Sequence, residues 1–102
     1  MRADPAALIG LDASAPGRIM QEKRLRRMAH RLGFDVVGPV MNLPANMILL
    51  AGVIRREDVD ALIVDKLDYL DLGAILPLVH EIITASPAVS YMRHSREELN
   101  IR

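Results

Sequence analysis

A short apolar run set between acidic residues, Ala61 to Val64, constrains the fold more than any other part of the sequence. Four consecutive apolar residues indicate a strand that is covered on both faces, because a half-exposed strand would alternate apolar and polar residues. Strands of this kind belong to parallel sheets with helices on both sides. Ligands of such sheets gather beyond the carboxyl ends of the strands. We therefore expect Asp65, Asp68 and Asp71, which follow the run, to lie where a site would form.

Strand-like and helix-like segments alternate along the whole chain. The apolar runs predict strands over 6–11, 34–40, 61–64 and 88–92. The amphipathic or apolar segments predict helices over 18–32, 47–57 and 73–85, and a last short helix that Ser95 and Glu98 would open as a capping box. Residues 42–46 are expected to form a loop. The alternation predicts an α/β fold: a single three-layer domain over residues 1–102, with a mostly parallel central sheet of about four strands.

The composition limits the classes of function. Thirteen basic and thirteen acidic residues cancel, so the chain has no general attraction to nucleic acid or to a membrane. The chain has no cysteine, which excludes disulfides and thiolate metal sites and fits a cytoplasmic protein. Its first residues do not resemble a signal peptide, and no segment approaches the roughly 20 apolar residues of a membrane span. We expect no cofactor, and the three histidines show no metal-ligand spacing.

One face of the helix predicted over 18–32 is basic. The residues on that face are Lys23, Arg24, Arg27 and Arg31. These side chains are candidates for binding phosphates or an acidic partner, and the alternative is an ordinary solvated face. The neighbouring Glu22 and the neutral total charge limit any DNA contact to a weak one.

Three parts of the chain share a pattern with a known family. The first is Gly10-Leu11-Asp12-Ala13-Ser14, followed by Gln21, Leu25, Ala29 and the segment 32–37. The second is the segment 60–72, which contains Lys66-Leu67-Asp68-Tyr69-Leu70, and the third is the apolar helix pattern over 75–82. In these residues the chain resembles the catalytic domain of serine recombinases, the resolvase/invertase family. The resemblance covers residues from about 7 to 92.

The resemblance implies a particular chemistry, and it also shows where this chain departs from it. In the family, a serine hydroxyl attacks a DNA phosphate, and several arginines stabilise the developing charge. Ser14 stands at or near the nucleophile position, and Asp68 matches the family's acid. The arginine positions, however, hold Asp12, Tyr69 and Leu72, and the loop 42–46 has no arginine either. Because losing one charge donor costs on the order of 10²–10³ in rate, we expect a catalytically inactive, resolvase-like domain that serves as an interaction or regulatory module.

Other interpretations of the same residues remain open. One is an active serine recombinase, with Ser14 as nucleophile and Asp68 assisting. Another is a receiver-like domain that holds Mg²⁺ or handles phosphoryl groups through Asp12, Asp65 and Asp68. The structural alternatives are that Ser14 belongs to a turn before a helix, and that the aspartates form a solvated loop and a helix N-terminus.

The helix predicted over 47–57 is apolar on nearly all sides. Its large apolar residues are Met47, Ile48, Leu49, Leu50, Val53 and Ile54. A domain of this size has difficulty covering such a helix completely, so one side is expected to meet a second chain. We therefore expect a homodimer that uses this helix or the terminal segment 93–102. On this hypothesis, Leu50→Asp gives a monomer or an insoluble product.

Overall fold

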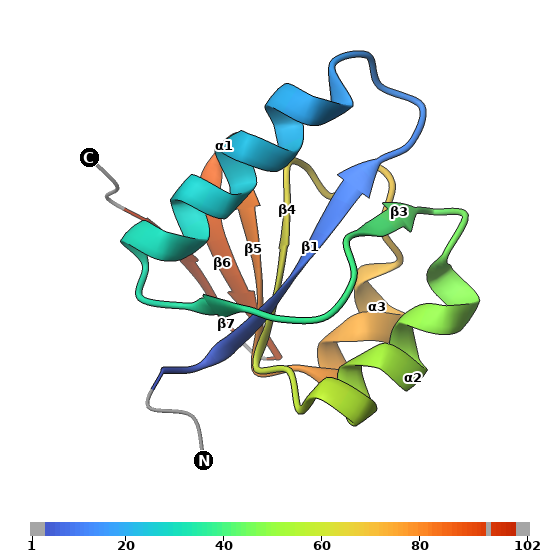
Figure 1. Ribbon diagram of the computed structural model, residues 1–102. Helices are drawn as coiled ribbons and strands as arrows, with labels where there is room; N and C mark the ends of the chain where they lie inside the picture. Colours follow the sequence, from blue (N-terminus) through green and yellow to red (C-terminus); the bar gives the residue numbers. More distant parts are fainter. Residues whose placement is uncertain (1–3, 94, 100–102) are drawn as a thin grey trace.

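The structure is a computed structural model that describes residues 4–93 and 95–99 (Figure 1). In chain order, the elements are β1 (Ala6–Asp12), α1 (Arg18–Arg31), β2 (Asp35–Val36), β3 (Met41–Leu43), α2 (Met47–Glu57), β4 (Ala61–Val64), α3 (Leu72–Ile75), the 3₁₀ turn η1 (Leu76–Leu78), β5 (Glu81–Ala85), β6 (Ala88–Met92) and β7 (Ser95–Glu98). No helix among these residues is long and apolar enough to cross a membrane.

All the strands belong to one mixed, mostly parallel sheet. Its order is β2-β1-β4-β5-β6-β7, and β3 also pairs with β1. The short strands β2 and β3 lie along the same edge of β1, with β2 at its start and β3 at its end. β4 pairs parallel with both β1 and β5. β6 and β7 then extend the sheet by antiparallel pairing.

Helices cover both faces of this sheet (Figure 1). On one face, Leu25 and Met28 of α1 pack with Ile9 and Ile63. On the other face, α2, α3 and η1 surround a second cluster that contains Leu62. All four residues of β4 are buried, as the unbroken apolar run predicted. The prediction of an α/β domain with a mostly parallel sheet and helices on both sides is thus confirmed at this level.

Three local predictions are wrong, and each of them omitted a strand that the sheet contains. The helix expected over 73–85 is only α3 and η1, and the segment then becomes strand β5. The β-branched residues Ile82, Ile83 and Thr84 are fully covered between neighbouring strands, where their shape favours strand over helix. The short helix expected at 95–98 is strand β7, and part of the expected loop 42–46 is strand β3. Within residues 4–93 and 95–99, the sheet consequently has seven strands instead of about four.

The connections define a switch point between β1 and β4. The chain leaves β1 for α1 on one face of the sheet, and it leaves β4 for α3 on the other face (Figure 1). The two strands are nevertheless neighbours, with Gly10 paired to Val64. In open α/β sheets, a crevice forms where adjacent strands send their connections to opposite sides. A binding or catalytic site is therefore expected at the carboxyl ends of β1 and β4.

Candidate functional site

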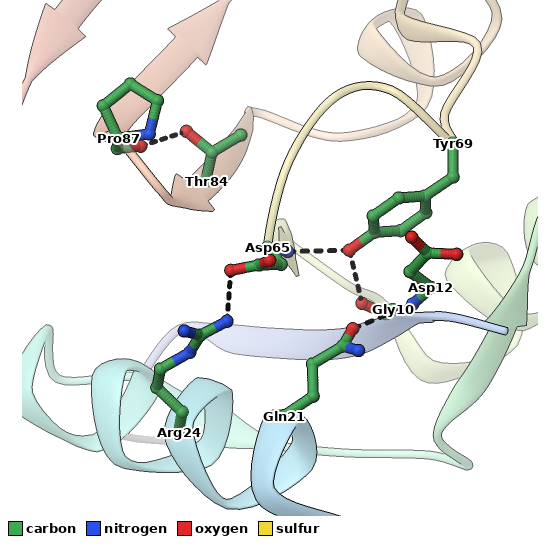
Figure 2. A network of polar contacts seen from close by, with 8 residues as sticks. All are labelled: Gly10, Asp12, Gln21, Arg24, Asp65, Tyr69, Thr84 and Pro87. Carbon is green, nitrogen blue, oxygen red and sulfur yellow. Dashed lines mark hydrogen bonds and ion pairs between the residues drawn. The ribbon is translucent and has the colours of Figure 1, made fainter. Parts of the chain in front are cut away.

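A buried tyrosine joins the ends of these two strands. The hydroxyl of Tyr69 accepts a hydrogen bond of 2.7 Å from the backbone N–H of Asp65, just after β4. The same hydroxyl donates to the carbonyl of Gly10 in β1, at 3.3 Å (Figure 2). Burial raises the pKa of the Tyr69 phenol above its ordinary value. Tyr69 is thus a neutral residue that connects the ends of β1 and β4 through two hydrogen bonds.

A buried glutamine connects α1 to the same strand end. Gln21 lies in the first turns of α1, and its Oε1 accepts a hydrogen bond of 2.8 Å from the backbone N–H of Asp12 (Figure 2). This bond satisfies an amide at the point where β1 ends. It also fixes the position of the turn that carries Ser14 relative to the helix.

Ser14 and Asp12 bond to each other in that turn. The Ser14 hydroxyl donates to Oδ1 of Asp12 at 2.7 Å, and the Ser14 backbone N–H donates to the same oxygen at 3.0 Å. These two bonds, the side-chain bond first, lower the pKa of the Asp12 carboxyl below its ordinary value. The arrangement is the local side chain to backbone turn that aspartate often forms before a helix.

The arginines near this end of the sheet bind other groups. Arg24 of α1 forms an ion pair with Asp65 (Figure 2). Arg18 donates to the side-chain oxygen of Asn42. Within residues 4–93 and 95–99, no guanidinium forms a hydrogen bond with Ser14. The cationic cluster that would hold a phosphate beside a serine nucleophile is therefore not assembled in the described part of the chain.

Among the described residues, no hydrogen bond joins Asp68 to Ser14. Asp68 is exposed, and it lines a separate small hollow of about 210 Å³ together with Thr84 and Tyr91. Among the described residues, no hydrogen bond or ion pair involves the Asp68 side chain. Asp71 instead caps α3 by accepting from the backbone N–H of Ala74 at 3.2 Å. Ser14 and Asp68, which the resemblance suggested as nucleophile and assisting acid, are thus not joined by any hydrogen bond among the described residues.

The described residues contain no group of three or more histidines or acids placed to hold a metal ion. Asp65 is held by Arg24, while Asp12 is held by its own turn. His80 directly precedes β5, and its Nε2 is 3.9 Å from Oδ1 of Asp60, which directly precedes β4. His94 lies outside the described residues. The arrangement needed for the receiver-like hypothesis, three acids around one cation, is not present in this part of the chain.

The four basic residues predicted as a binding face line two adjoining hollows on α1. Lys23, Arg24 and Arg27 line a hollow of about 450 Å³ that also includes Asp65. Arg24, Arg27 and Arg31 line a second one of about 280 Å³. The structure therefore brings together the basic residues that the sequence singled out, at the edge of the switch point.

Sequence reasoning missed two features of this region. The ion pair between Arg24 and Asp65 joins residues 41 positions apart, and no local sequence pattern predicts it. The hydrogen bonds by which Tyr69 connects the two strand ends likewise depend on the register of β1 and β4. A polar aromatic residue shortly after a buried strand was the only available signal.

Comparison with known proteins found no matching family model, no matching curated protein and no matching solved structure.

Proposed function

We propose that this protein is a non-catalytic, serine-recombinase-like domain that acts by binding other macromolecules. The observation that carries the proposal is the bond between the Ser14 hydroxyl and the Asp12 carboxylate. A serine that cleaves DNA needs cations around the phosphate it attacks. Here the group beside the hydroxyl is an anion, which repels a phosphate. The recombinase-like part of the proposal is supported by the sequence segments that resemble that family.

The chemistry around Ser14 supports the same proposal. No histidine is a described partner of its hydroxyl, and the arginines closest along the chain to the site are bound to Asn42 and Asp65. Turning this arrangement into a cleavage site would require breaking an ion pair and moving a carboxylate. Both changes cost free energy before any reaction begins. The lack of cysteine is the support for placing this module in the cytoplasm.

A trapping experiment tests the absence of cleavage. The protein is incubated with nicked suicide duplexes of mixed sequence, on which a covalent protein–DNA adduct would persist. The expected result is no adduct with the wild type or with Ser14→Ala, while an active serine recombinase on its own site supplies the positive control. An adduct that forms with the wild type and is lost in Ser14→Ala would show that catalysis survives.

The same proposal includes self-association through α2. Ile48 and Leu49 on the outer side of this helix are 93% and 62% exposed. Leu49 also lines a hollow of about 470 Å³ that includes Gly52. Large apolar side chains exposed together favour contact with another apolar surface. The alternative surface, 93–102, belongs in part to residues outside the described range, and its residues 95–98 form β7.

The structure changes which substitution tests this idea. Leu50 is fully buried in the core, so Leu50→Asp would place a carboxylate inside the domain and unfold it. Ile48→Asp avoids that cost because the side chain is exposed. Analytical ultracentrifugation should show a dimer for the wild type and a folded monomer for Ile48→Asp. Ile19→Asp, on the exposed side of α1, is the matched control and should remain dimeric. A wild-type chain that sediments as a monomer at high concentration would contradict self-association.

A further inference from the structure

The two hollows along α1 form one continuous surface because they share Arg24 and Arg27. We call this surface the basic groove; it contains Lys23, Arg24, Arg27 and Arg31 from α1 and Asp65 from the end of β4. Lys23 and Arg31 are eight residues apart, which corresponds to about 12 Å along a helix. The groove is thus long enough for about four residues of an extended peptide.

The charge of the basic groove is not balanced within the domain. Asp65 is the acid that lines it, and this carboxylate is already paired with Arg24. Lys23, Arg27 and Arg31 have no ion pair among the described residues. The whole chain has a formal net charge of zero, so this concentration of positive charge is local. A ligand for the groove should therefore carry negative charges at a similar spacing.

The groove also has an apolar part, which narrows the class of ligand. Met20 and Pro16 line its first hollow, and Met28, Ala85 and Ala88 line its second. Met20 is largely exposed, and methionine adapts its shape to varied apolar partners. A nucleic-acid backbone would leave these apolar atoms uncovered, and the groove has no aromatic residue on which a base could stack. Acidic and apolar side chains together would match both parts.

We propose that the basic groove binds an acidic segment of a partner protein, one in which glutamate or aspartate residues alternate with large apolar residues. In an extended segment, alternate side chains point to opposite sides. Its carboxylates would pair with the cations of α1, and its apolar side chains would lie against Ala85 and Ala88 at the turn between β5 and β6. This inference deepens the proposed function, because it specifies the chemistry of one partner.

Asp65 has a specific role in this proposal, as an internal competitor for Arg24. The ion pair, which Figure 2 shows reaching from α1 to the end of β4, occupies one of the four cations of the groove. The Asp65 side chain has no other described hydrogen bond, so Asp65→Asn removes the competing charge and leaves the size of the residue unchanged. This substitution should release Arg24 for the ligand and strengthen binding.

The test uses fluorescence anisotropy with two labelled synthetic peptides of equal length, one alternating glutamate and leucine and one of glutamate alone. The alternating peptide should bind more tightly, with an affinity that falls as salt is added. Arg27→Ala should weaken binding about fivefold, and Asp65→Asn should strengthen it by a similar factor. Arg26→Ala is the matched control: it removes the same charge from α1, but Arg26 pairs with Glu22 and does not line the groove. Arg26→Ala should leave the affinity unchanged.

Each opposite result would overturn the inference. Failure of the wild type to bind the alternating peptide removes the ligand class. Equal loss in Arg26→Ala and Arg27→Ala would mean that net charge, and not the groove, attracts the peptide. Tighter binding of a DNA duplex, with the same dependence on Arg27, would make the groove a nucleic-acid site. None of these results bears on DNA cleavage or on self-association, so failure here is distinguishable from failure of the proposed function.

Discussion

The hydroxyl of Ser14 donates a 2.7 Å hydrogen bond to Asp12, the residue that stands where the recombinase resemblance places an arginine. An acid at the position where the resemblance led us to expect a cation does more than alter the charge, because Asp12 also binds the Ser14 hydroxyl. The same carboxylate accepts a bond from the backbone N–H of Ser14, which closes the turn between β1 and α1. Asp12 therefore stabilises the backbone of this turn.

The bond predicts a change in titration when Ser14 is replaced. Because the Ser14 hydroxyl is the largest cause of the lowered Asp12 pKa, Ser14→Ala should raise this pKa toward the ordinary value of 3.8. NMR titration of the side-chain carboxyl group measures it directly. Ser86→Ala, at an exposed serine with no bond to Asp12, is the control and should leave the titration unchanged. An Asp12 pKa that stays equally low in Ser14→Ala would mean that the side-chain bond is absent in solution.

The two hydrogen bonds of the Tyr69 hydroxyl predict a loss of stability in Tyr69→Phe. Phenylalanine keeps the buried ring but removes the oxygen that serves the Asp65 N–H and the Gly10 carbonyl. Leaving such groups without their partner costs about 1–3 kcal/mol in the free energy of unfolding. Urea denaturation measures this difference. Tyr91→Phe is the control, because no hydrogen bond of the Tyr91 hydroxyl is described, and it should lose much less.

The raised pKa of Tyr69 predicts weaker stability at high pH. The folded protein keeps the phenol proton at pH values where the unfolded chain, with an ordinary value of 10.0, has released it. The protonated Tyr69 phenol therefore makes its full contribution to the free energy of unfolding below pH 10.0. That contribution is lost as the pH rises through the higher pKa that Tyr69 has in the folded protein. Thermal unfolding followed across this range should show a steeper fall for the wild type than for Tyr69→Phe. Parallel curves for the two proteins would contradict a buried, neutral phenol.

Much of the parallel part of the fold was predictable because its signals are local. The run from Ala61 to Val64 has no polar residue to expose, so it had to be a covered strand. The helices α1 and α2 were also found, since their apolar residues recur at helical spacing over several turns. Strand β5 was missed because an apolar segment next to α3 fits a helix equally well by periodicity. Only its pairing with β4 and β6 decides the matter.

The sequence indicated which residues lie near the candidate site, but it did not indicate how their side chains are arranged. The positions of Ser14 and Asp68 after β1 and β4 follow from the sequence, but their separation depends on how each loop leaves its strand. The basic residues of α1 were correctly grouped because one helix fixes their spacing. The pairing of Arg24 with Asp65 was not predictable, since it depends on the way that α1 crosses the end of β4.

The packing around Gly10 predicts that even one added methyl group will destabilise the end of β1. A Cβ at this position would lie 2.7 Å from Cδ1 of Leu43 and 3.0 Å from Cγ1 of Val64. Both neighbours are fully buried, so neither can move without disturbing the core. Gly10→Ala should therefore lower the free energy of unfolding by about 1–3 kcal/mol, measured by urea denaturation.

The matched control for Gly10→Ala is Gly52→Ala in the middle of α2. A Cβ at Gly52 meets no atom within 4 Å, and alanine is favoured over glycine inside a helix by about 0.5–1 kcal/mol. The two substitutions add the same methyl group but should change stability in opposite directions. If Gly10→Ala were also neutral or stabilising, β3 could not pack against β1 as described. The edge that carries Asn42 and Leu43 beside the switch point would then need a different position.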